Sequence, residues 1–335
     1  MNKKGIIFLT LSIVVFGIIF CVALMIGRYP ISIYDFINCV FTNKSEFETQ
    51  RSIILNLRLP RTIMACLVGI GISLSGLLFQ EIFQNKLTSP DLLGVSSGAS
   101  VGASIAIIIG LSSLYISVFA FITGVVTVII TIFISKLFKN GSSFTLILAG
   151  IIVSGFMSAM LSLVKYFADP TTTLSSITYW LMGSFENAKM SNVIVLFPVI
   201  LVCCIILLTL SWRINVISLG FEEAQTKGLN YKFYRILIIC IATLLTASSV
   251  AFCGTISWIG LVIPHIVRLI VGRDTRKTIP LCISFGATFM IIVDIISRTF
   301  TDSEIPLSAV TGLFGTIIFV CILMHKRKEI SHDYN

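Results

Sequence analysis

Charged residues are scarce in this chain of 335 residues, of which only 12% are Asp, Glu, Lys or Arg. Soluble domains carry about 25% charged residues, so this scarcity excludes an ordinary soluble fold. Hydrophobic residues make up 56% of the chain, and the mean hydropathy is +1.02. The composition therefore indicates a polytopic membrane protein without a soluble domain.

Signatures of common catalytic and metal-binding sites are also absent from the sequence. There is no G-x-x-x-x-G-K-[ST] loop, so the chain should not bind ATP in that manner. The nine cysteines mostly lie in apolar runs and include no C-x-x-C pair, and the three histidines are widely separated. No nucleophile, base and orienting group stand out as a set. We therefore expect no catalytic residue, no bound metal and no cofactor.

Long apolar runs, by contrast, are abundant, and a helix needs roughly 20 such residues to cross a bilayer. The run 92–135 is too long for one crossing and breaks at "GLSSLY" (110–115), and the run 236–267 breaks near "CGT" (253–255). The first run, 6–27, is longer than a signal-peptide core and lacks a good cleavage site. The sequence therefore predicts an all-helical protein with ten transmembrane helices in a single domain over 1–335.

The distribution of basic residues predicts the orientation of these helices, because cytoplasmic loops carry an excess of Lys and Arg. Ten crossings place both termini on the same side. If that side is the cytoplasm, sixteen of the 24 basic residues lie inside, including those in the loops near 86, 139, 222 and 274. The net charge of +9 is then an orientation signal and gives no reason to invoke nucleic acid. We expect a multi-pass membrane protein in contact with lipid, with both termini cytoplasmic.

A stripe of small residues runs along the third expected helix. Gly94, Gly98, Gly102, Ala106 and Gly110 recur every four residues. In lipid, helices associate through such faces because small side chains let the backbones approach closely. The stripe therefore faces protein, either in helix packing within one subunit or beside a translocation path or subunit contact.

Two polar features interrupt the apolar pattern. The segment "SLGFEEAQTKGLN" (218–230) contains the paired Glu222 and Glu223 and predicts a short surface helix that Gly228 terminates, with an ordinary solvated loop as the alternative. Asp294 lies within the ninth expected span, where a carboxylate is costly and marks a function or a partner. Arg298 lies one turn away, which favours a local ion pair over a transported-proton site.

Eight segments, in this order along nearly the whole chain, resemble the FecCD-type permease subunits of ABC importers. They are "RLPR" (58–61), "GISLSGLLFQEIFQNKLTSPDLLGVSSGAS" (71–100), "LILAG" (146–150), "YWLMGSF" (179–185), "SLGFEEAQTKGLN" (218–230), "GLVIPHIVRLIVGRD" (260–274), "DIISRTF" (294–300) and "EIPLSAVTGLFGT" (304–316). The chain departs from the usual pattern at Lys86, at Thr88 and in "TISW" (255–258), and these changes bear on the local backbone.

The resemblance implies a transport subunit of the bacterial cytoplasmic membrane and not an enzyme. It implies two permease subunits, identical or paralogous, around a central path, with two cytoplasmic ATP-binding subunits. It also implies an extracytoplasmic substrate-binding protein that delivers an iron siderophore, haem or cobalamin, and we expect an iron(III)-siderophore complex. The segment 218–230 is then the coupling helix that receives the ATPase. Its expected coupling residues are Leu219, Gly220, Glu222, Glu223, Ala224 and Gly228.

Two further sets of residues receive roles from the resemblance. A cytoplasmic gate is expected at Ser142, Ser143 and Phe144. Arg58, Arg61 and Arg298 fall on the outer face, where basic residues should be rare. On sequence alone they anchor lipid headgroups, or in the case of Arg298 pair with Asp294. The resemblance instead favours docking of carboxylates from the binding protein, which a guanidinium can grip through two hydrogen bonds.

Two other classes of protein compete with this interpretation. A secondary transporter driven by ions is the main rival, and a membrane enzyme is a distant third. Asp294 is the only charged residue well inside a span, and a single charged residue is little for binding a coupling ion. The lack of a clustered His, Cys or acid site argues against the enzyme.

Overall fold

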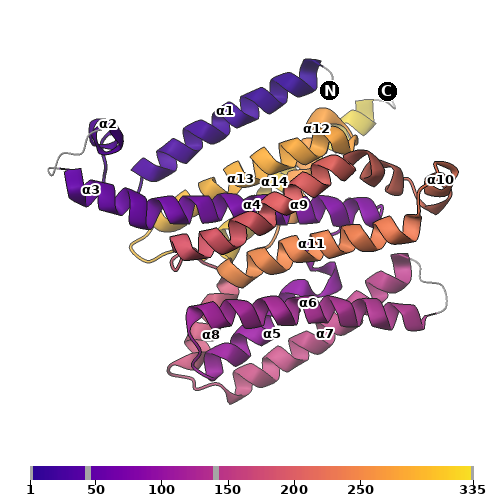
Figure 1. Ribbon diagram of the computed structural model, residues 1–335, viewed down its shortest axis with the longest axis horizontal. Coiled ribbons are helices and arrows are strands. Elements are labelled where there is room, and N and C mark those ends of the chain that lie inside the picture. Colours follow the sequence, from indigo (N-terminus) through magenta and orange to yellow (C-terminus); the bar gives the residue numbers. More distant parts are fainter. Residues whose placement is uncertain (1–2, 42–46, 139–142, 333–335) are drawn as a thin grey trace.

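The computed structural model describes residues 3–41, 47–138 and 143–332, and all regular structure in these ranges is helical (Figure 1). Seven helical segments are long and apolar enough to cross a membrane. They are α1 (Lys3–Met25), α3–η2–α4 (Glu48–Ser52, Ile53–Arg58 and Leu59–Ile82), α6 (Ser113–Leu137), α7 (Ser143–Phe167), α9 (Met190–Ile217), α11 (Tyr231–Cys253) and α13 (Thr275–Thr299).

Three shorter apolar helices complete the ten segments expected from the sequence. They are α5 (Val95–Ile108), α12 (Ile259–Val271) and α14 (Leu307–His332), the last of which is apolar as far as Ile322. Both expected breaks are confirmed, because α5 ends before α6 begins at Ser113 and α11 ends at Cys253 before α12. The remaining short elements are α2 (Ile33–Phe41), η3 (Pro90–Leu93), α8 (Thr173–Met182) and α10 (Phe221–Thr226).

Helix α4 forms the centre of the fold. In the most hydrophobic part of its segment 89% of the residues are buried, against 17% in α7 and 11% in α1. Side-chain hydrogen bonds tie α4 to its neighbours. Ser73 donates to the carbonyl oxygen of Cys282 in α13 (2.8 Å), and Ser75 donates to that of Ala242 in α11 (2.9 Å). Such bonds between helices add to van der Waals packing in lipid, where no hydrophobic effect drives helices together.

Two close contacts between helix backbones involve glycines of α4 that the sequence analysis did not single out. A Cβ at Gly76 would overlap the carbonyl oxygen of Gly260 in α12, and one at Gly69 would overlap that of Gly286 in α13. The available signal was the run "GIGISLSG" (69–76), in which Gly69, Ser73 and Gly76 are spaced by four and three residues. Helical spacing of this kind places small residues on one face.

The small-residue stripe of α5 faces α6 in the same chain. A Cβ at Gly98 would overlap the hydroxyl of Thr127, and one at Gly102 would overlap that of Thr123. Gly94 precedes α5 with a φ of 82°, which an L side chain rarely adopts. Gly110 does not continue the stripe, because it follows the helix and has nothing within 4 Å of an added Cβ. The structure therefore supports the packing alternative for Gly94, Gly98 and Gly102.

We expect Gly98→Leu to destabilise the chain more than Gly155→Leu does. The new side chain would push α6 away from α5, and overpacking of this kind costs about 1–3 kcal/mol. Gly155 is a matched control, since it also lies inside a helix but has nothing within 4 Å of an added Cβ. Thermal unfolding of the detergent-solubilised variants measures the difference. Equal melting temperatures would contradict the close packing of α5 on α6.

Two bulky residues adopt a positive φ, and both lie beside the departures from the family pattern. Gln84, at 51°, follows α4 two residues before Lys86, and Trp258, at 71°, immediately precedes α12. Non-glycine residues in this region are uncommon and persist only where packing holds them. Trp258 is held against α14, where a Cβ added to Gly315 would lie 2.6 Å from the Trp258 Cβ.

Candidate functional site

The segment 218–230 folds into a short exposed helix, as the sequence predicts. Helix α10 spans six residues, Phe221–Thr226, between Gly220 with a φ of 115° and Gly228 with a φ of 72°. Glu222 and Glu223 occupy its first turn and are exposed, and negative charge there is favourable next to the unpaired N–H groups of a helix N-terminus. Ala224 is fully buried and anchors the helix to the hydrophobic core.

Helix α10 lies at one end of the bundle, next to the end of α4. The side-chain nitrogen of Gln84 lies 3.2 Å from the position that a Cβ of residue 220 would take. Figure 1 shows both chain termini toward this same end and α8 at the opposite end. Leu219 is also exposed here, with 58% of its surface accessible. The coupling residues thus form one protruding unit on the bundle, although their coupling role stays a prediction.

A buried cluster of four charged side chains lies near the start of α4. Arg61 Nε is 2.7 Å from Asp294 Oδ1, and its Nη1 and Nη2 lie 2.5 and 3.0 Å from the carboxylate oxygens of Glu304. Arg298 Nε is 3.3 Å from Asp294 Oδ2. Two cations and two anions therefore neutralise one another, which offsets part of the desolvation cost of burying Asp294. The ion pair expected between Asp294 and Arg298 is confirmed. Glu304 was missed, because its place in "EIPL" gave no sign of a partner 243 residues away.

Of the three arginines expected to dock a binding protein, Arg58 and Arg298 are buried, and the side chain of Arg61 is 11% exposed. Arg58 is 5% exposed and donates to the carbonyl oxygens of Leu24 (3.0 Å), Met25 (2.6 Å) and Tyr29. Arg298 is 6% exposed and donates to the Ala23 carbonyl at 2.6 Å. The contacts with Ala23, Leu24 and Met25 satisfy carbonyl groups that the C-terminus of α1 leaves unpaired. Docking through these arginines stays a prediction, and it now requires that the contacts open.

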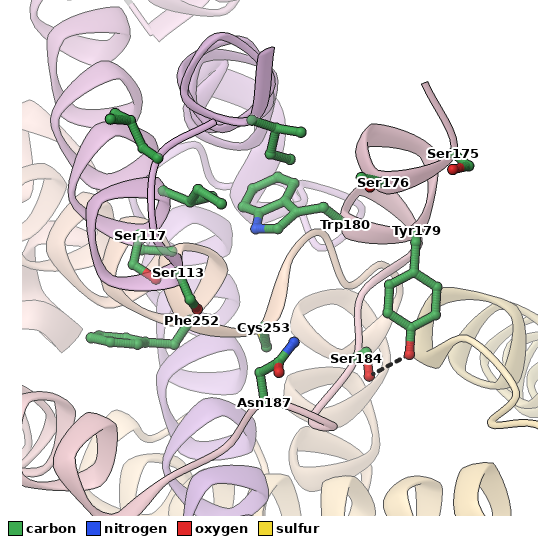
Figure 2. Close-up of a pocket in the computed structure, with 14 residues that line it drawn as sticks. Ser113, Ser117, Ser175, Ser176, Tyr179, Trp180, Ser184, Asn187, Phe252 and Cys253 are labelled. Carbon is green, nitrogen blue, oxygen red and sulfur yellow. Dashed lines mark hydrogen bonds between the residues drawn. The ribbon is translucent and has the colours of Figure 1, made fainter. Parts of the chain in front are cut away.

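A cavity of about 680 Å³ lies at the α8 end of the bundle, between α8, the α5–α6 turn and the end of α11 (Figure 2). Hydroxyl and amide groups of Ser113, Ser117, Ser176 and Asn187 contribute to its lining, and none of the 14 lining residues is charged. Tyr179 donates its hydroxyl hydrogen to Glu186 Oε2 at 2.6 Å, and its oxygen lies 3.1 Å from Ser184 Oγ. The sequence analysis missed this cavity, although serines border the break at 110–115.

The expected cytoplasmic gate is only partly visible. Ser142 lies outside the described residues, Ser143 begins α7, and Phe144 is 72% exposed. An exposed aromatic ring at the start of a helix can contact a partner or lipid, so this arrangement leaves the gate a prediction. No group of three or more His, Cys, Asp or Glu residues that could hold a metal occurs in the ranges that the structure covers.

Comparison with known proteins places these features in a family. The model of the FecCD transport family matches residues 14–325. The molybdate import system permease protein MolB of Haemophilus influenzae is 38% identical over 324 residues, which is 96% of this chain and 95% of that protein. The hemin transport system permease protein HmuU of Yersinia pestis is 30% identical over 295 residues, covering 86% and 88% of the two chains.

A solved structure agrees with the fold. The chain superimposes on an inward-facing conformation of a putative metal-chelate type ABC transporter with a TM-score of 0.86 and 36% identity, over 95% of this chain and 98% of the other. The relatives are permease proteins of transport systems and not enzymes. The chain therefore belongs to the FecCD transport family and is a permease subunit of an ABC importer.

Proposed function

We propose that this permease imports a bulky metal chelate, with an iron(III)-siderophore complex as its cargo. An extracytoplasmic binding protein delivers the complex to a pair of permease subunits, identical or paralogous. Two cytoplasmic ATP-binding subunits engage α10 and drive the transport. In this arrangement the α10 end and both termini face the cytoplasm, and the cavity beside α8 faces outward.

The observation that carries the cargo proposal is the uncharged lining of the cavity in Figure 2. Its volume of about 680 Å³ falls within the range of about 300–1,000 Å³ that is typical of sites for small molecules. Serine hydroxyls and the rings of Trp180 and Phe252 give it a mixture of hydrogen-bonding and apolar surface. Such a surface suits an organic chelator that wraps its metal, because the chelator presents polar and apolar atoms instead of bare charge.

Molybdate is the second candidate cargo, and a specific observation favours it. The molybdate permease of Haemophilus influenzae shares 38% identity with this chain, more than the 30% shared with the hemin permease. A bare dianion, however, would find no positive charge among the lining residues of the cavity. Haem and cobalamin remain alternatives, since a cobalamin permease of Photorhabdus laumondii is 30% identical over 327 residues.

We expect Ser176→Trp, which fills the cavity from α8, to lower uptake of iron-55 bound to a hydroxamate siderophore by about tenfold, a change of about 1.4 kcal/mol. Thr209→Trp is the control, because Thr209 is exposed on α9 and does not line the cavity. Uptake is measured in cells that express the complete transporter, in parallel with molybdenum-99 molybdate. Transport of molybdate without transport of the siderophore would overturn the cargo proposal in favour of the second candidate.

A further inference from the structure

A second, smaller cavity lies at the α10 end and has the opposite electrostatic character. Its volume is about 190 Å³, and it is lined by the ends of α4, α9 and α12. Three of its lining residues are basic, Lys86, Arg268 and Arg273, and one is acidic, Glu81. Amide and hydroxyl groups complete the wall. They belong to Gln80, Gln84, Asn215 and Ser218.

Arg268 is the residue that defines this cavity as a site. Its side chain is only 8% exposed, and a single nitrogen, Nη1, binds Glu81 Oε1 at 3.0 Å. The other two nitrogens, Nε and Nη2, are buried and have no hydrogen-bond partner among the residues that the structure covers. A buried donor without a partner costs free energy, and the cost is higher for a charged group. The guanidinium group therefore keeps unsatisfied N–H groups on Nε and Nη2, and because both atoms have almost no accessible surface, a ligand in the cavity reaches them when the Arg268 side chain turns toward it.

The charge balance selects the class of that ligand. Three cations against one carboxylate leave two positive charges in excess, so an anion is favoured and a cation is not. A guanidinium group matches an oxyanion in particular, because two parallel N–H groups can bind two of its oxygens. The cavity's volume of about 190 Å³ is less than a third of the 680 Å³ of the cavity beside α8, which suits a small tetrahedral anion better than a bulky chelate.

From this geometry we infer that the permease binds a tetrahedral oxyanion in the cavity formed by Arg268, Arg273 and Lys86. Inorganic phosphate, molybdate and the phosphate of a lipid headgroup share this chemistry. Binding of any of them would join the ends of α4, α9 and α12 through one ligand.

The position of the site links it to α10. Leu219, which lines the cavity, is one residue from Gly220, and Gln84, also in the lining, contacts the position of Gly220. A bound anion therefore stiffens the junction from which α10 protrudes. An effect on transport rests on the proposed coupling role of α10, whereas anion binding itself does not.

Binding is tested on the purified full-length chain in detergent after lipid removal, with radiolabelled inorganic phosphate and molybdate in equilibrium dialysis. The expected result is one saturable site per chain, with the affinity reduced tenfold or more in Arg273→Gln and also in Arg268→Lys, which keeps the charge but loses the fork. Arg276→Gln is the matched control, because Arg276 is exposed and pairs with Asp274 outside the cavity. We expect its affinity to equal that of the wild type.

Native mass spectrometry of protein that retains its lipids separates the two sources of the anion. One tightly held phospholipid that is lost in Arg273→Gln identifies a headgroup phosphate as the ligand. Saturable binding of free phosphate to lipid-free protein in equilibrium dialysis identifies the soluble anion. The inference is overturned if neither free oxyanion nor phospholipid binds, or if Arg273→Gln and Arg276→Gln bind equally well. Because these measurements need no ATP-binding subunit, they can fail while the proposed import function holds.

Discussion

Replacing Arg61 by alanine is expected to destabilise the folded permease by about 3–5 kcal/mol, the cost of removing one partner from a buried ion pair. Arg61 bridges Asp294 of α13 and Glu304 of the loop before α14, and Asp294 is fully buried. Without Arg61, Arg298 alone faces two carboxylates. Arg298 still pairs with Asp294, so the carboxylate of Glu304 is left without a cation in a largely buried position.

Arg276→Ala is the matched control for this substitution. It also removes an arginine from a pair with an aspartate, but its side chain is 58% exposed. Water replaces such a partner easily, so we expect no measurable change in the melting temperature. Thermal unfolding and size-exclusion profiles in detergent compare the two variants. If Arg61→Ala melts together with Arg276→Ala, the cluster does not stabilise the fold and Arg61 becomes available for docking.

The burial of Arg61 also changes how docking of a binding protein can be tested. Charge reversal at Arg58 and Arg61 would remove the donors that bind the Leu24 and Met25 carbonyl oxygens of α1 and the Asp294 carboxylate of α13. Loss of uptake would then follow from misfolding as readily as from lost docking. A variant that keeps each guanidinium but alters the exposed surface around it is needed instead. Arg28 provides such a site, since it is exposed and lies just after α1.

The ten segments were predictable from the sequence because hydropathy alone decides whether a helix can cross lipid. The breaks at 110–115 and near 254 were found because each lies in an apolar run that is too long for one crossing. Polar or glycine residues mark the place where each run divides. The short helix at 218–230 was predictable for a similar local reason, since Gly220 and Gly228 adopt backbone angles that favour glycine.

The central place of α4 was not predictable in the same way. Lipid and protein interior are both apolar, so a membrane helix carries little hydrophobic asymmetry to show which face is buried. The stripe on α5 has a strict repeat of four, whereas the small residues Gly69, Ser73 and Gly76 of α4 are unevenly spaced. Their partners, Gly286 and Gly260, lie about two hundred residues away in the sequence, and their positions become known only from the fold.

Burial of the arginines and the two cavities were missed for a related reason. The sequence places Arg58 at a helix start, where an arginine can anchor headgroups or bind a partner. The guanidinium group of Arg58 binds the unpaired carbonyl oxygens at the end of α1 only because α1 packs beside α4 in the folded chain. The sequence does not show this packing. Likewise, Arg268 looks like one more cytoplasmic cation until the ends of α4, α9 and α12 enclose it.

We expect Gly228→Pro to leave the permease in the membrane and to uncouple ATP hydrolysis from uptake. Gly228 ends α10 with a φ of 72° and donates its backbone N–H to Gln225 at 3.0 Å. Proline fixes φ near −65° and has no N–H, so the end of α10 must change direction. Nothing lies within 4 Å of a Cβ at Gly228, so the change acts through the backbone and not through a packing clash.

Glu223→Arg tests the same surface through charge, since Glu223 is exposed in the first turn of α10 and its reversal disturbs no described ion pair. If α10 transmits motion from the ATPase, uptake per ATP hydrolysed should fall about 5- to 150-fold in both variants, as expected for losing a coupling free energy of about 1–3 kcal/mol.

Gly272→Pro is the matched control for the backbone change. Gly272 follows α12 with a φ of 81°, donates its N–H to Arg268 at 3.0 Å and has nothing within 4 Å of an added Cβ. Proline there imposes the same local strain as at residue 228, but in a turn outside α10. Because Gly272 adjoins Arg273 of the proposed anion site, we expect the coupling ratio to fall much less than in Gly228→Pro, in proteoliposomes that contain the complete transporter. A cysteine placed at residue 222 adds a topological test, because a reagent that cannot cross the membrane should fail to label it in intact cells. Labelling from outside, or normal coupling in both α10 variants, would show that α10 is a surface loop without contact to the ATPase, since a helix on the wrong side of the membrane cannot receive its motion.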